Sequence, residues 1–218
     1  MSTSKIILTK WTRPLPLNRD HRMVKNASLQ LLPDWFIRYK FVNSLFLGLS
    51  VGAIFTIYAP LDPSIYSIGG VLLAVAMLIV ARLYHRIMTT TWFFRISLFV
   101  EVILLLAILY FLLFPYTYQT ALLVYAGYQA TFVFGSYLVR AETLLLPSDT
   151  LLTRLDTAKQ LGYLIGMASS YLFYKFIAHY GIVSNQEKVY DLHYLLFATE
   201  VIVIWLILKS FKGTSNNR

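Results

Sequence analysis

Six apolar segments alternate with short polar ones along this chain. They cover residues 41–59, 65–84, 92–114, 120–139, 161–178 and 192–208. At 1.5 Å of rise per residue, a helix of each length can cross a hydrocarbon core of roughly 30 Å. The pattern therefore predicts an all-α polytopic membrane protein with six transmembrane helices in residues 35–211. Residues 1–34 are expected to form a basic cytoplasmic tail, partly disordered or interfacial, and residues 212–218 a second cytoplasmic tail.

The basic residues fall almost entirely on one side of these predicted spans. Of the 19 Lys and Arg residues, all but Lys175 and Lys188 lie in the two tails, the second and fourth loops, or the adjoining span ends. Because cytoplasmic segments carry the excess of Lys and Arg, both termini are predicted to be cytoplasmic. The expected location is a bacterial cytoplasmic membrane, spanned several times.

Composition agrees with a protein that has the lipid bilayer as its main partner. The chain is 58% hydrophobic and only 13% charged, whereas about a quarter of residues are charged in soluble domains. Its net charge of +9 lies beside the span ends, which argues against nucleic-acid binding. There are no cysteines, no nucleotide-binding glycine loop and no zinc-protease motif, and the four histidines are scattered. We expect no enzymatic activity, no metal and no cofactor.

Ionisable residues inside the spans are the first functional candidates. An ionised side chain at the centre of a bilayer costs at least about 2.5 kcal/mol unless it meets water or a partner. Glu200 lies near the middle of the sixth span, and His193 precedes it by seven residues on the same helical face. Glu101, in the third span, is expected either to pair with Arg82 or Arg95 or to act in function. Proton coupling is therefore assigned to Glu101, His193 and Glu200.

Polar side chains also follow one face of the fourth span and, more weakly, of the first. Steps of three or four residues give the fourth span an inward-facing stripe, flanked by Tyr128, of Tyr125, Gln129, Phe132, Ser136 and Arg140. Two readings remain open for these faces: a substrate pathway, or hydrogen bonds between helices. The pathway residues would be Asn43, Tyr58, Tyr125, Tyr128, Gln129 and Ser136.

The fifth span begins beside a cluster of mixed charge. Gly162 and Gly166 are four residues apart, a spacing that favours close helix packing. The charged residues where the fourth and fifth spans reach the cytoplasm are Arg140, Glu142, Arg154, Asp156 and Lys159. They form either a solvated face or an inner gate whose ion pairs break and reform.

Two stretches resemble the N-terminal half of a major facilitator superfamily transporter. One is the first span, residues 47–58 (LGLSVGAIFTIY); the other runs from Arg140 through Pro147 and Arg154 to residues 160–166 (QLGYLIG). The loop at residues 82–88 (RLYHRIM) lacks the glycine and aspartate usual in that family and keeps Arg86, with Arg95 beyond it. The resemblance implies a half-size secondary transporter whose small-molecule site is completed by a second copy or another six-helix partner.

Two function classes thus remain. The polar stripe and Glu200 favour transport of a small solute. The missing loop signature favours a non-transporting membrane scaffold, assembly or regulatory subunit, in which the same polar groups only hold helices together.

Overall fold

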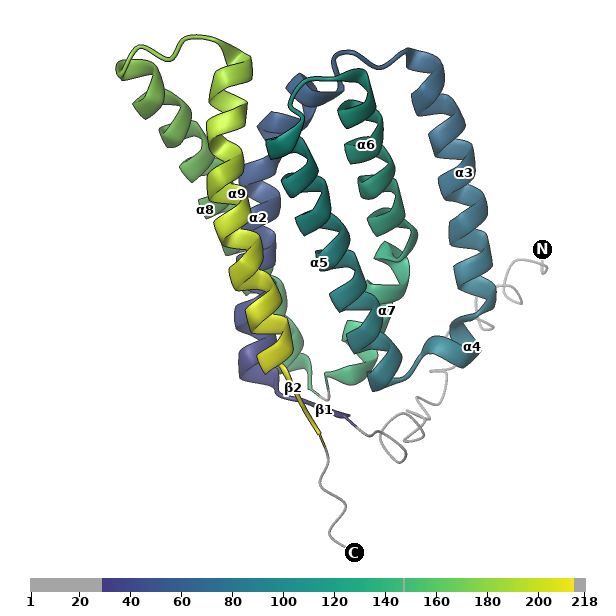
Figure 1. Cartoon of the computed structure of the whole chain (residues 1–218). Helices are drawn as coiled ribbons and strands as arrows, with labels where there is room; N and C mark the ends of the chain where they lie inside the picture. The colour runs from purple at the N-terminus through teal and green to yellow at the C-terminus, as the bar shows by residue number, and fades with distance from the viewer. Residues whose placement is uncertain (1–28, 147, 214–218) are drawn as a thin grey trace, which may run out of the picture.

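The structure is a computed structural model in which residues 29–146 and 148–213 are described. Their helices are α2 (Pro33–Tyr58), α3 (Pro63–Arg82), α4 (Tyr84–Ile87), α5 (Thr90–Leu113), α6 (Tyr118–Val133), α7 (Gly135–Leu145), α8 (Asp149–His179) and α9 (Asn185–Lys209), and their strands are β1 (Leu29–Leu31) and β2 (Phe211–Gly213). The long helices form an up-and-down bundle (Figure 1). Each apolar segment coincides with helix, which confirms a helical membrane-type chain.

Helix starts are set by short polar side chains that precede the apolar runs. Asp62 accepts a hydrogen bond from Ser64 N at 2.8 Å, and Thr117 accepts one from Thr120 N at 3.1 Å. Such caps satisfy backbone N–H groups that the first helical turn leaves unpaired. As a result, α3 and α6 begin two residues before the apolar segments that predicted them.

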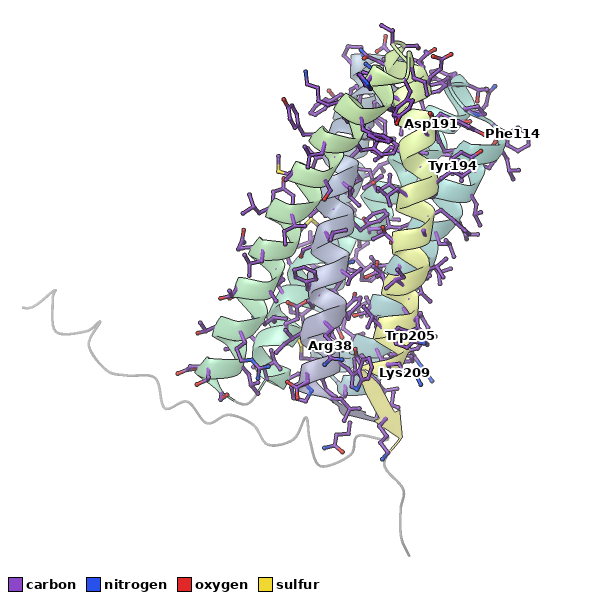
Figure 2. All side chains as sticks on the ribbon, turned by 90° about the vertical axis from the view of Figure 1, so that its left-hand side faces the viewer. Arg38, Phe114, Asp191, Tyr194, Trp205 and Lys209 are labelled. Atoms are coloured by element: carbon purple, nitrogen blue, oxygen red, sulfur yellow. The ribbon has the colours of Figure 1, made fainter. Side chains whose placement is uncertain are left out.

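Five helical segments are long and apolar enough to cross a membrane: Pro33–Tyr58, Pro63–Arg82, Thr90–Leu113, Tyr118–Leu145 and Asn185–Lys209. The helix α8 is not among them, because charged residues fill its first turns and small or polar residues lower its hydropathy afterwards. Figure 2 nevertheless shows α8 running beside α2 along the bundle.

The two strands join the ends of the described chain. Antiparallel pairing aligns Leu29 with Gly213 and Leu31 with Phe211. Phe211 packs against the rings of Phe36, Phe93 and Phe94, with centroids 4.9 to 6.5 Å apart. We call this the strand end of the bundle and the opposite one the far end. In Figure 2, Arg38 and Lys209 lie at the strand end, whereas Asp191 and Phe114 lie at the far end.

The strands also revise the predicted tails. Residues 29–31 are a strand and α2 begins at Pro33, so ordered structure starts before the boundary predicted after residue 34. The second tail was expected from residue 212, yet β2 continues to Gly213. Residues 1–28 and 214–218, the remainder of the predicted tails, lie outside the described residues.

The fourth apolar segment is broken into α6 and α7 at Phe134. Its backbone N–H bonds to Thr131 O, three residues back, at 3.2 Å. This tighter turn shifts the residues that follow around the helix axis. Tyr137 is consequently buried and Ser136 exposed. The prediction of one continuous inward stripe is therefore wrong: Tyr125 faces inward, whereas Ser136 and Arg140, after the break, are exposed. Phe132, which precedes the break, is exposed as well.

The helix α2 is the centre of the bundle and packs most extensively against α8 and α9. Glycines permit this approach. A Cβ atom on Gly162 would lie 2.2 Å from Phe41 O, and one on Gly166 would lie 2.2 Å from Leu45 O. Gly48 of α2 makes the reciprocal close contact with α8, since a Cβ atom on it would lie 2.4 Å from Tyr163 O. The close packing predicted for Gly162 and Gly166 is confirmed.

The main buried apolar side chains gather in two clusters along the bundle. The strand-end cluster includes Phe36, Phe93 and Ile207. The far-end cluster includes Phe46, Phe111 and Leu192. Between them along α2, α5 and α9 lies a layer of buried polar side chains, namely Lys40, Ser44, Ser97, Glu101, Thr199 and Glu200. Buried polar groups are costly unless they are paired, so this layer holds the candidate functional residues.

Candidate functional site

Two carboxyl groups from different helices meet in the buried polar layer. Glu101 of α5 and Glu200 of α9 are 1% and 0% exposed. They lie close enough for a hydrogen bond between the two carboxyls. Without a proton there is no donor between them: Glu101 Oε2 and both oxygens of Glu200 are buried and have no hydrogen-bond partner among the described residues. One proton shared between the two carboxyls supplies the missing hydrogen-bond donor.

Side chains of α2 donate hydrogen bonds to only one of the two carboxyls, that of Glu101. Tyr39 donates its hydroxyl hydrogen to Glu101 Oε1, and Asn43 Nδ2 donates to the same oxygen at 2.9 Å. Two donors on one oxygen stabilise an ionised carboxylate. Glu200 has no such donors, so it is the group suited to carry the proton, with Glu101 as its acceptor.

A second buried charge cluster lies next to the pair. Glu142 of α7 pairs with Lys40 of α2 and, at 3.4 Å, with Lys159 of α8. The ammonium of Lys40 also lies over the rings of Phe36 and Tyr39, 5.6 and 5.1 Å from their centroids. This cluster ties three helices together at the strand end of the polar layer.

The predicted proton-coupling residues are thus brought to the interior, with one correction. His193 and Glu200 are both buried on the inner face of α9, as their spacing predicts. Glu101 forms no ion pair with Arg82 or Arg95 within residues 29–146 and 148–213. Arg95 instead lies 5.6 Å from the ring of Trp92. Of the two alternatives left open for Glu101, the ion pair with Arg82 or Arg95 is therefore wrong, because α5 turns Glu101 toward α2 and α9.

The predicted inner-gate residues separate into different contacts. Glu142 and Lys159 belong to the cluster with Lys40, and Asp156 adds a contact of 3.6 Å to Lys159 from an exposed position. Arg154 pairs at 3.0 Å with Asp34, at the start of α2. Arg140 takes no part, since its guanidinium lies over the ring of Tyr84, 5.6 Å from its centroid.

The predicted substrate-pathway residues do not form one site within this chain. Tyr58 and Tyr125 meet Tyr66 of α3 in a far-end tyrosine cluster, with ring centroids 5.4 to 6.3 Å apart. Asn43 donates its side-chain hydrogen bond to Glu101 instead. Ser136 lies on the exposed side of α7.

Gln129 and Tyr128 lie on different sides of α6. Gln129 lines an open apolar groove of about 360 Å³ between α3 and α6. Tyr128 points into the bundle, where it lines a cavity of about 20 Å³ with Ser50 and His193. Adjacent helix positions are about 100° apart, so neighbours cannot share one narrow face.

Sequence reasoning missed Tyr39 and Lys40 as site residues. Both lie in the interfacial first turns of α2, where aromatic and basic side chains ordinarily contact lipid headgroups. A signal was present: Tyr39 and Asn43 are four residues apart and therefore share the face that meets Glu101. Nothing in the local sequence shows that Lys40 would be buried.

Comparison with known proteins adds no relative. No protein-family model, curated protein or solved structure matches the chain.

Proposed function

We propose that this chain is a six-span, half-size unit of a proton-coupled membrane transporter, in which the Glu101–Glu200 pair binds the coupling proton. The observation that carries the proposal is the buried carboxyl pair with unpaired oxygens on Glu200. Three other buried side chains, Ser97, Gln129 and Tyr174, also have a polar atom without a partner among the described residues, but of these groups only the carboxyls can be satisfied by gaining a proton. Carboxyls that need one proton for satisfaction suit a site that loads and releases it.

The proposed topology has six spans, with α8 as the fifth, and both termini in the cytoplasm. Pairing of β1 with β2 supports an even number of crossings, because it places both ends of the described chain at one end of the bundle. The described basic residues at that strand end are Arg38, Lys40, Arg82, Arg86, Arg95, Arg140, Arg154, Lys159, Lys209 and Lys212. Positive charge on one side supports a cytoplasmic strand end, in a bacterial inner membrane.

Single cysteines test this topology, and the chain has none of its own. Asp62→Cys, Tyr118→Cys and Ser184→Cys should react with a membrane-impermeant maleimide added to intact cells, because these residues lie at the far end. Met88→Cys and Ser148→Cys should react only after the membrane is opened. Labelling of Met88→Cys in intact cells would contradict the six-span arrangement.

The proposed solute site lies between this bundle and a second unit. The interior cavity beside Tyr128, of about 20 Å³, is far smaller than the several hundred Å³ of an ordinary ligand pocket. A solute therefore needs a surface of the bundle and a second wall. A parallel second copy, or a distinct six-helix partner, would supply that wall.

Proteoliposomes that contain the pH indicator pyranine test the coupling. We expect pools of small solutes to include one that changes the internal pH with wild-type protein. Glu200→Gln keeps the shape but cannot release a proton, so the response should disappear. Glu187→Gln, an exposed carboxyl on the same helix, is the matched control and should respond as wild type does. An undiminished response in Glu200→Gln would exclude the pair as the proton carrier.

The second candidate is a membrane scaffold or regulatory subunit. It is favoured by the tight interior and by polar contacts that join helices, such as Asn43 with Glu101 and Lys40 with Glu142. In that case no solute pool should move protons. Glu200→Gln should then retain co-purifying membrane partners and resist unfolding better than wild type, since an unpaired buried carboxyl is removed.

A further inference from the structure

The buried polar layer holds more unpaired oxygens than one proton can satisfy. Glu101 Oε2, both carboxyl oxygens of Glu200 and Ser97 Oγ are buried and have no hydrogen-bond partner among the described residues. Ser97 is 0% exposed and precedes Glu101 by four residues on α5, so the two side chains share one face of that helix. A proton between the carboxyls leaves the second oxygen of Glu200 and the Ser97 hydroxyl as they were.

The donors of α2 do not reach these oxygens. Tyr39 and Asn43 both donate to Glu101 Oε1, so Oε2 is the oxygen of that carboxyl that remains free. The strand-end and far-end clusters of apolar side chains lie on either side of the layer and add no donor. Buried acceptor oxygens that gather without donors have the composition of a cation site, because a cation satisfies several of them at once.

We infer that Glu101, Glu200 and Ser97 form a binding site for a sodium ion, which exchanges with the coupling proton. On binding, Na⁺ is coordinated by Glu101 Oε2, by the Glu200 carboxylate and by Ser97 Oγ. The O–H bond of the protonated carboxyl breaks, its electron pair stays on the carboxylate, and the proton leaves to the aqueous phase. One positive charge replaces another. The inference rests on the proposed function, because it gives a second ion to the same carboxyl pair.

A monovalent ion suits this set of ligands better than a divalent one. Ca²⁺ takes about six to eight oxygen ligands, and Mg²⁺ usually keeps several of its waters. Within residues 29–146 and 148–213, no group of three or more His, Asp or Glu side chains could hold a metal ion. Sodium is preferred to the larger potassium ion because the two carboxyls lie within hydrogen-bonding distance of each other.

The other ionisable groups nearby do not account for exchange of a proton near neutral pH. Those that other helices place around the pair and the adjoining ion cluster are Tyr39 and Lys40 of α2, Tyr128 of α6, Glu142 of α7 and Lys159 of α8. Tyrosine and lysine ordinarily titrate at about pH 10, and Glu142 is paired with both lysines. On α9 itself, His193 is about two turns away and lies 2.6 Å from Val189 O through Nδ1.

Binding of radioactive sodium to the full chain in lipid nanodiscs tests the site without knowledge of the solute. We expect saturable binding that unlabelled Na⁺ displaces and K⁺ does not. Where the pair holds one proton, each fall of one pH unit should raise the half-saturating sodium concentration about ten-fold, because one proton competes with one ion. Glu200→Gln should abolish binding, and Ser97→Ala, which removes one ligand, should weaken it by about ten-fold or more.

Ser50→Ala is the matched control and should bind sodium as wild type does. Ser50 is also a buried serine, 1% exposed, but its hydroxyl already donates to Leu47 O at 3.0 Å. Wild-type affinity in Ser97→Ala would overturn the assigned ligands. Absence of saturable binding to the wild-type protein, or binding that ignores pH, would overturn the sodium site even where a variant fails to fold. A pyranine response in sodium-free potassium buffer would then still support the proton-coupled function.

Discussion

Replacing Gly166 by alanine should separate α2 from α8 and destabilise the bundle more than any other addition of one methyl group outside the same glycine contact. The new Cβ would lie 2.2 Å from Leu45 O and 3.0 Å from both Leu45 C and Leu49 N. These are backbone atoms, so no side-chain rotation can make room. Overpacking of this kind costs about 1–3 kcal/mol or more, and helix association in lipid depends on such close contact.

The measurement is unfolding in mixed micelles of increasing SDS content, followed by circular dichroism. Gly70→Ala on α3 is the matched control, because nothing lies within 4 Å of its Cβ position. Alanine favours helix over glycine by up to about 1 kcal/mol, so this variant should be as stable as wild type or more so. Equal midpoints for the two variants would show that α2 and α8 do not pack through Gly166.

Glu142→Gln should be the most destabilising change of charge in the described part of the chain. It leaves the ammonium of Lys40, a side chain 10% exposed, without its anionic partner. Breaking a buried ion pair by removing one partner costs about 3–5 kcal/mol, because the remaining charge stays desolvated. Loss of Glu142 should leave Lys159 at a smaller energetic cost, since 28% of its side chain is exposed and Asp156 stays beside it.

A second substitution distinguishes an unpaired charge from simple loss of packing. Lys40→Met in the Glu142→Gln background removes the stranded charge and should recover most of the lost stability in the same SDS titration. Asp34→Asn is the matched control: its pair with Arg154 is exposed and should contribute about 1 kcal/mol at most. If Lys40→Met deepens the loss in this background, the two residues do not form the buried pair described here.

The helical segments and two of their internal relations followed from local pattern. A run of about twenty apolar residues forms a helix wherever it is placed in a bilayer, because lipid offers the backbone no other hydrogen-bond partner. The spacing of His193 and Glu200 put both on one face of α9. The spacing of Gly162 and Gly166 allowed the close approach to α2. Each relation lies within one helix and needs only its periodicity.

The site itself depends on relations between helices. The break at Phe134 turns the second half of the fourth segment, so Ser136 and Arg140 leave the face that holds Tyr125. A single tight turn hardly changes which residues a segment contains. The apolar pattern of the fourth segment therefore did not reveal the break. Burial of Lys40 and the meeting of Tyr39 with Glu101 depend on how α2 is rotated against α5 and α7.

By itself, the sequence determined that the chain is a helical membrane-type protein, which segments are helical, that Gly162 and Gly166 allow another helix to come close, and that Glu200 lies near the middle of its span. Only the tertiary structure decided that Glu101 is the neighbour of Glu200, that α2 supplies donors to one carboxyl alone, and that Glu142 pairs with a buried Lys40. The physical reason is the range of each determinant. Hydrophobic periodicity acts along one helix, whereas the rotation and offset of packed helices are set by the side chains of all their neighbours together.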